Sequence, residues 1–395
     1  MHTNRPALGI ALLAGFGLSS AVFAQPVIDG TADAIYDTEA AVQDTQTQFG
    51  DNSDPDPGFA NGSELDGVYS FTQDGVLYMV LSGNLESNFN KLEIFIDSVP
   101  GGQNRLRGDN PDVDFNGLNR MGDDGNGNGL TFDAGFEADY WISMTGGPDG
   151  DGRYQLFANY AKLRTDNDQG IGAFLGSGRA QSDGTLQDGD NFPGIRMTID
   201  NSNVGGVIGG CDPDDGAGVP TGIEMAIPLT AIGNPFGSIK VCAFVNGGGH
   251  DFMSNQVLKG IGGGCNLGEP RNVDFNTIAG DQFATLTGGF GTEPFSLLTS
   301  PLTAGGVAQL MTMNGTPNAR HYFGYSLTGL GSTPVPPLGV TADLDNPTQI
   351  GSATADSTGS ATISRGVPNS AQGARVYMQA LENGDKTNVV ARIVN

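Results

Sequence analysis

A group of oxygen-bearing side chains between residues 112 and 123 has the spacing of a calcium-binding loop. Asp112, Asp114 and Asn116 place carboxylate or amide oxygens at alternate positions, Gly117 follows at once, and Asp123 supplies a later acid. Oxygens at alternate positions can point into one ring around a hard cation, and the glycine allows a sharp turn. The sequence therefore predicts a structural calcium site at Asp112, Asp114, Asn116 and Asp123. The alternative is a solvated turn, because turns favour Asp, Asn and Gly in any case.

Two neighbouring aromatic residues are candidates for ligand contact. Trp141, the one tryptophan of the chain, follows Tyr140 in an apolar segment. An aromatic ring can stack on the apolar face of a sugar while a tyrosine hydroxyl bonds outward. We therefore predict Trp141 and Tyr140 as ligand-binding residues. A place in the core of a β-sandwich is the more common role for such a tryptophan, and this alternative stays open.

The scarcity of histidine argues against catalysis. His250 and His321 are the only histidines after the first few residues. No nucleophile-elbow pattern is available to pair with His250, and a histidine-ligated zinc would lack ligands. Paired carboxylates for glycoside hydrolysis stay open, because the sequence does not give the separations among its 44 acidic residues. We predict that the chain is not an enzyme.

The three cysteines predict one disulfide and one free thiol in an exported chain. Cys242 lies in an apolar run that is typical of a buried strand. Cys211 and Cys265 each lie in a glycine-rich segment, whose flexibility makes this pair the easier one to join. We predict a disulfide between Cys211 and Cys265.

The N-terminus has the features of a secretory signal peptide. His2 and Arg5 give a positive start, an apolar run covers residues 7–16, and small or branched residues precede Gln25. The apolar run is too short to span a bilayer. We predict cleavage after Ala24 and a protein that is secreted or held at the cell surface, without membrane insertion.

The charge of the chain limits its partners. It has 44 acidic and 18 basic residues, which gives a formal net charge of −26. Nucleic acid and anionic membrane surfaces would be repelled by such a chain, so neither is an expected partner. Disorder is excluded as the explanation, because hydrophobic residues make up 37% of the chain and recur in organised runs.

Short apolar segments separated by Gly, Asn and Asp predict an all-β fold. Such strands at regular spacing are typical of β-sandwiches, and no window has the 3.6-residue period of a long helix. Residues 229–232 are the best candidate for a single helical turn. A shift in composition near residue 300 indicates two sandwiches, a large one over residues 25–300 and a small immunoglobulin-like one over residues 301–395. The predicted strands are 68–71, 76–81, 92–96, 140–144, 154–157, 195–199, 223–227, 239–245, 307–313, 321–327, 348–355, 360–364, 375–380 and 388–394.

Three segments of the first unit resemble the family 9 carbohydrate-binding module and its DOMON-type relatives. Residues 27–36 are similar to the opening "IDG…D…Y/W" strand of that family, residues 92–97 to its "vEhfhD" strand, and residues 222–232 to its "EhaIPhsaL" segment. In family order these matches cover most of residues 25–298, and they imply a β-sandwich that binds carbohydrate. Family 9 modules hold sugar rings between tryptophan faces. This chain departs from the pattern with its single tryptophan, so a tyrosine would have to replace the second ring.

The last part of the chain resembles small terminal sandwich domains on exported proteins of environmental bacteria, planctomycetes among them. Residues 325–334, 344–347 and 376–380 carry this resemblance. It implies a structural or anchoring accessory and no activity.

The expected function is that of an exported, non-catalytic binding protein whose partner is a polysaccharide or a cell-surface glycan. The alternative is a structural component of the cell surface or extracellular matrix that binds no small molecule. An exposed cluster of Trp141 with tyrosines would favour the first, and a fully buried Trp141 would favour the second.

Overall fold

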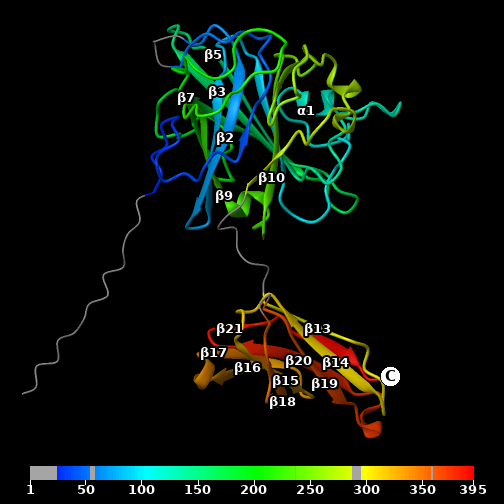
Figure 1. The fold of residues 1–395 in the computed structure, drawn as a ribbon. Helices are drawn as coiled ribbons and strands as arrows, with labels where there is room; N and C mark the ends of the chain where they lie inside the picture. The colour runs from blue at the N-terminus through cyan, green and yellow to red at the C-terminus, as the bar shows by residue number, and fades with distance from the viewer. Residues whose placement is uncertain (1–24, 54–57, 236, 287–294, 357–358) are drawn as a thin grey trace, which may run out of the picture.

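The computed structural model describes residues 25–53, 58–235, 237–286, 295–356 and 359–395 (Figure 1). The predicted signal peptide, residues 1–24, lies outside the described residues. The described chain is all-β, as predicted, and its single α-helix, α1 (Gly117–Arg120), has four residues. No helix in this part of the chain is long and apolar enough to cross a membrane.

Residues 25–286 form a sandwich of two antiparallel sheets. In spatial order, the first sheet contains β1 (Ala41–Val42), β2 (Glu64–Gln73), β3 (Val76–Asn84), β9 (Gly222–Pro228) and β8 (Arg196–Ile199). The second contains β11 (Met253–Val257), β10 (Ile239–Asn246), β4 (Lys91–Asp97), β5 (Tyr140–Pro148), β6 (Tyr154–Lys162) and β7 (Ile171–Arg179), with β12 (Ala284–Leu286) also beside β10. The predicted helical turn is the 3-10 helix η1 (Leu229–Ile232).

Side chains alternate across each strand, so the second sheet contributes to two cores. Met79 of β3 and Ile94 of β4 belong to the core between the sheets. Phe95, Trp141 and Phe244 point to the opposite face and form a second core. That face is covered by the segments 98–139 and 258–283, which include α1, η2 (Pro270–Asn272) and η3 (Phe275–Thr277). The second sheet is therefore buried on both faces over part of its length.

Residues 295–395 form a smaller unit with its own core, which includes Leu310, Phe323 and Ala380. One sheet contains β13 (Ser296–Thr299), β14 (Val307–Met313) and β19 (Ala361–Gly366). The other contains β18 (Thr348–Thr354), β15 (Arg320–Ser326), β20 (Arg375–Glu382), β21 (Asp385–Lys386) and β22 (Val390–Ile393). A hairpin joins β16 (Leu330–Val335) to β17 (Val340–Leu344), and 3-10 turns η4 (Pro336–Leu338) and η5 (Asn369–Ala371) complete the unit.

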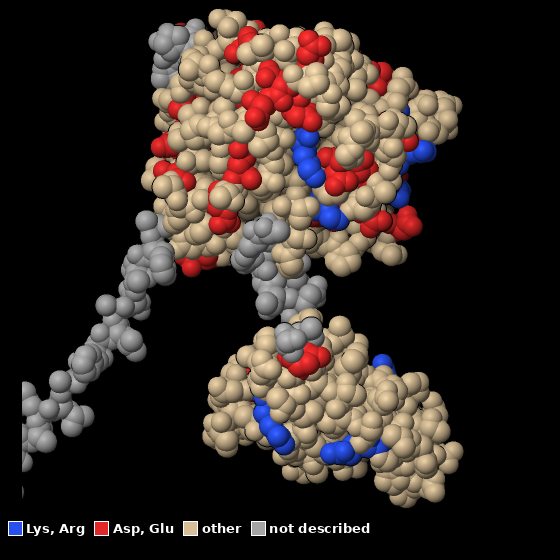
Figure 2. All heavy atoms as spheres, viewed as in Figure 1, with Lys and Arg blue, Asp and Glu red and all other residues tan. Residues whose placement is uncertain are grey.

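Acidic side chains are spread over the surface of the first unit. On the face shown in Figure 2, Asp and Glu form several separate patches over residues 25–286, whereas Lys and Arg gather along one side of that unit. The excess of negative charge is therefore a property of the folded surface and is not confined to one loop.

A disulfide joins Cys211 to Cys265, the pair indicated by their glycine-rich loops, and Cys242 is free and buried in β10. The two bonded residues are separated by 54 positions. Replacing both by serine is expected to lower the free energy of unfolding by about 2–4 kcal/mol, because the unfolded chain loses a constraint. Urea denaturation of the double variant would measure the loss.

Reductant provides the control for this prediction. It should destabilise the wild-type chain by the same amount and leave the double variant unchanged. Burial raises the pKa of Cys242, so its thiol should not react in the folded chain. A wild-type unfolding midpoint that does not move on reduction would contradict the prediction.

Candidate functional site

One face of the second sheet changes from apolar to polar along its strands. Phe95 and Trp141 are paired in register at the apolar end, within the second core. Toward the start of β4, the next pair on this face is Glu93 with Ser143, and the pair after that is Lys91 with Thr145. These four polar side chains are all buried. The alternation of β4 and β5 therefore places a buried polar floor directly beside an apolar core.

A buried ion-pair network crosses this floor. His250, in the loop after β10, places Nδ1 2.7 Å from Glu93 Oε1 and Nε2 3.0 Å from Asp114 Oδ2. Lys91 Nζ lies 2.8 Å from the same Asp114 oxygen. The indole Nε1 of Trp141 donates to Glu93 Oε2 at 2.9 Å. Two cations thus face two carboxylates, and the four charges balance in an environment from which water is largely excluded.

The network sets the protonation of its members. Burial lowers the pKa of His250, but the charges of Glu93 and Asp114 and the hydrogen bonds to them outweigh burial and raise that pKa to about 9. Burial acts to raise the pKa of Asp114, but the bonds and charges of His250 and Lys91 lower it to about 2. At neutral pH the site therefore holds an imidazolium and a carboxylate.

The loop that carries Asp114 approaches His250 closely. A Cβ atom added to Gly117 would lie 2.2 Å from the His250 ring, so only glycine fits at this point of α1. The backbone here also departs from its usual conformations. Positive φ angles occur at Phe89 (65°), Asp114 (48°), Phe115 (53°), Asn116 (65°) and His250 (55°). Such conformations cost free energy and gather at functional sites, so their clustering marks this region as a candidate.

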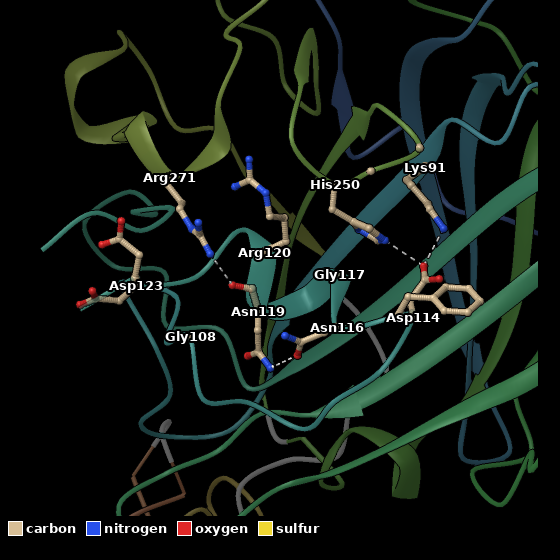
Figure 3. Close-up of a pocket in the computed structure, with 14 residues that line it drawn as sticks. Lys91, Gly108, Asp114, Asn116, Gly117, Asn119, Arg120, Asp123, His250 and Arg271 are labelled. Carbon is tan, nitrogen blue, oxygen red and sulfur yellow. Dashed lines mark hydrogen bonds and ion pairs between the residues drawn. The ribbon is translucent and has the colours of Figure 1, made fainter. Parts of the chain in front are cut away.

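A polar pocket of about 590 Å³ opens beside the network (Figure 3). Arg120 and Arg271 line it together with Asp123. Arg120 donates to both carboxylate oxygens of Glu269, and Arg271 donates to backbone carbonyls in the segment 119–122. Both guanidinium groups are thus committed to holding the covering segments in place.

An aromatic groove of about 490 Å³ adjoins the polar pocket and shares Lys91, Asp114 and Phe115 with it. Three phenylalanine side chains in its walls are unusually exposed to solvent. Phe115 is fully exposed, at 103%, and Phe89 and Phe174 are 47% and 41% exposed. The remaining lining residues are Thr145, Phe157 and Asn159. We use the term aromatic groove for these eight residues. Apolar walls over a polar floor can hold a ligand that has both kinds of surface.

The structure does not gather the four predicted calcium ligands around one point. Asp114 is paired with Lys91 and His250, and Asn116 accepts a hydrogen bond from Asn119. Figure 3 shows Asp123 on the other side of the pocket from Asp114, and Asp112 does not line the pocket. In the described part of the chain, no three acidic, His or Cys side chains gather as metal ligands. The spacing instead produces left-handed backbone and a short helix.

The two residues predicted to contact a ligand, Trp141 and Tyr140, both have buried rings. Trp141 is 0% exposed, and Tyr140 is 5% exposed on the opposite face, within the core between the sheets. Neither ring can stack on a ligand. The four phenylalanines of the groove were not among the residues predicted from the sequence to bind a ligand. Phe115 carried a usable signal, because a large apolar residue in a turn of Asp, Asn and Gly has no core to enter.

The comparisons with known proteins add little. No protein-family model and no curated protein matches the chain. Escherichia coli alpha-2-macroglobulin activated by porcine elastase is 11% identical over 93% of this chain, with a TM-score of 0.17. The BSP domain of a biofilm-associated protein is 10% identical over 92% of this chain, with the same TM-score. This chain spans 41% of the first structure and 68% of the second. At these TM-scores neither likeness bears on fold or function.

Proposed function

We propose that the chain is an exported, non-catalytic protein that binds a polysaccharide or cell-surface glycan in the aromatic groove. The observation that supports this most is Phe115. Its ring is fully exposed, and its backbone has a φ of 53°, a conformation that bulky residues avoid. Neither folding nor packing gains from this arrangement, so a bound ligand is the simplest source of compensation.

A carbohydrate fits the composition of the groove. A pyranose ring has an apolar face that stacks on aromatic side chains and an edge of hydroxyl groups. Phe89 and Phe157 lie against each other, with ring centroids 6.5 Å apart, and Phe174 and Phe115 supply further rings. Lys91, Thr145 and Asn159 place donors and acceptors at the floor. This division into apolar walls and a few polar groups suits orientation of a sugar ring.

The network beneath the groove supports a binding role over a catalytic one. A general acid for glycoside hydrolysis needs a raised pKa, whereas the pKa of Asp114 is lowered to about 2. Both ring nitrogens of His250 lie against carboxylates, so the imidazole is not placed to take a proton from a nucleophile. The negative surface disfavours nucleic acid and polyanionic partners, so a neutral glycan is the partner that we propose.

The alternative function, a structural surface or matrix component without a small ligand, is favoured by one observation. Trp141 is fully buried, so the tryptophan clamp of family 9 modules is absent. The resemblance to that family and the calcium site predicted from the spacing of residues 112–123 stay hypotheses. The four exposed or half-buried phenylalanines are what lead us to prefer carbohydrate binding.

Replacing Phe115 by asparagine is expected to weaken glycan binding about tenfold or more, equal to about 1.4 kcal/mol. The variant removes the ring but suits a positive φ, so the fold should be retained. Glycan-array screening of residues 25–395 would identify the ligand, and titration calorimetry would give the affinities of both chains.

Phe192→Ala is the matched control for the Phe115 variant. Phe192 is also a half-exposed phenylalanine, at 50%, but it does not line the groove. Its replacement should leave the affinity unchanged. Equal losses in both variants would point to nonspecific adsorption. Absence of binding to every glycan tested would instead favour the structural role.

A further inference from the structure

Two buried acids on the first sheet have no cation beside them. Glu64 is 1% exposed and Asp66 is 0% exposed, and both lie on β2. Among the described residues, no Lys, Arg or His forms an ion pair with either one. A pair of buried acids without a counter-charge is unstable unless protons or a cation neutralise it.

Three buried oxygens in the same place lack any partner. They are Oε2 of Glu64, Oδ1 of Asn84 and Oγ of Ser82. Glu64 and Asn84 face each other across β2 and β3, and Ser82 lies two residues from Asn84 on the same face of β3. All three residues are at most 1% exposed. Buried oxygens are nearly always satisfied, so three unsatisfied ones together indicate a missing ligand.

The segment 201–221 closes over these oxygens. Asn203 Nδ2 donates to Glu64 Oε1 at 3.0 Å and to Asp66 Oδ2 at 2.7 Å, which holds the two carboxylates together. The backbone N–H of Val207 donates to Asp66 Oδ1 at 2.9 Å. Gly206 has a φ of 91°, and a Cβ there would lie 1.9 Å from the same oxygen. The cover is therefore fitted to the carboxylates and fixes their positions.

We propose that Glu64, Asp66, Ser82 and Asn84 bind a calcium ion beneath the segment 201–221. Carboxylate, amide and hydroxyl oxygens are ligands for a hard cation, and the site offers no imidazole or thiolate for a softer one. Two of the four donor side chains are acids, and the other two are a neutral amide and a neutral hydroxyl. A divalent ion would neutralise both carboxylates and satisfy the three free oxygens at once.

The test is a comparison of melting temperatures for residues 25–395 in chelator and in about 5 mM calcium, since extracellular calcium sites are often as weak as about 0.1–1 mM. Calcium binds only the folded site, so at about 5- to 50-fold excess over such a dissociation constant it should raise the melting temperature by about 2–6 °C. Equilibrium dialysis of the wild-type chain should show bound calcium. Equal melting curves in the two buffers would overturn the proposal.

Glu64→Gln locates the ion. Glutamine has the shape of the protonated acid and keeps an acceptor for Asn84 and Asn203, so this variant should melt no lower than the wild type in chelator. It should also lose the calcium shift. Retention of the full shift in Glu64→Gln would overturn the proposal, even if calcium binds elsewhere.

The matched control is the double variant Asp112→Asn with Asp123→Asn, in the loop whose spacing resembles a calcium motif. It should keep the full calcium shift. Loss of the shift here, with retention in Glu64→Gln, would place the ion in that loop and overturn the assignment to β2 and β3. If Glu64→Gln fails to fold, Ser82→Ala removes one neutral ligand. It should then weaken calcium binding in dialysis, and an unchanged affinity would count against the site.

Discussion

Replacing His250 by asparagine is expected to lower the free energy of unfolding by about 3–5 kcal/mol. The change removes the cation that faces Glu93 and Asp114, and Glu93 is 0% exposed, so its charge would stay buried with only neutral donors. Asparagine tolerates the φ of 55° at this position, so the effect reports the lost charge and not the backbone. Guanidinium denaturation of both chains would measure the difference.

The pH dependence separates this explanation from a loss of packing. The pKa of His250 is raised from 6.5 to about 9, so its ion pairs contribute fully below pH 6.5 and are lost as the pH rises through about 9. The pKa of Asp114 is lowered from 3.8 to about 2, so its contribution is present above pH 3.8 and is lost as the pH falls through about 2. The gap between wild type and variant should therefore be widest near pH 5–6 and shrink toward about pH 10. A constant gap would contradict the electrostatic account.

Local patterns predicted most of the strands because these strands have one or two apolar faces. The segment 307–313 coincides with β14, and residues 229–232 coincide with η1. The missed elements lack that signal. In β16, one glycine and one proline interrupt the apolar alternation. In β7, a glycine-rich strand, apolar residues follow no clear period.

The candidate site was harder to predict because it depends on partners that are distant in sequence. The spacing from Asp112 to Asp123 indicated a calcium loop, but Lys91 of β4 and His250 of the loop after β10 reach Asp114 and neutralise it. The glycine of that pattern, Gly117, is required by the His250 ring beside it. The spacing of residues within one loop does not predict the ion pairs of Asp114 or the contact of Gly117 with the His250 ring. The acids proposed to bind calcium, Glu64 and Asp66, lie within a strand and match no loop motif.

The alternation of side chains along β5 determines which core each aromatic ring enters. Its neighbour Tyr140 points into the core between the sheets, so Trp141 points into the second core. The sequence shows that the two rings lie on opposite faces of a strand. It does not show that both faces are covered, because the covering segments 98–139 and 258–283 are irregular and follow no period.

Replacing Trp141 by alanine is expected to lower the free energy of unfolding by about 3–5 kcal/mol, because it leaves a large cavity among Phe95 and its neighbours. Trp141→Phe should cost less, about 1–3 kcal/mol, because it fills most of the space but leaves Glu93 Oε2 without the indole donor. Chemical denaturation followed by circular dichroism would measure both, since the chain has no other tryptophan to report by fluorescence.

Glycan binding by the Trp141→Phe variant then tests which aromatic residues contact the ligand. A buried ring makes no ligand contact, so this variant should bind with wild-type affinity at temperatures where it stays folded. Phe115→Asn should show the opposite behaviour, with normal stability and weakened binding. Comparing the stability and the glycan affinity of the two variants therefore distinguishes a core role for Trp141 from a ligand-binding role for Phe115. A folded Trp141→Phe chain that no longer binds glycan would return the binding site to Trp141 and contradict the assignment to the aromatic groove.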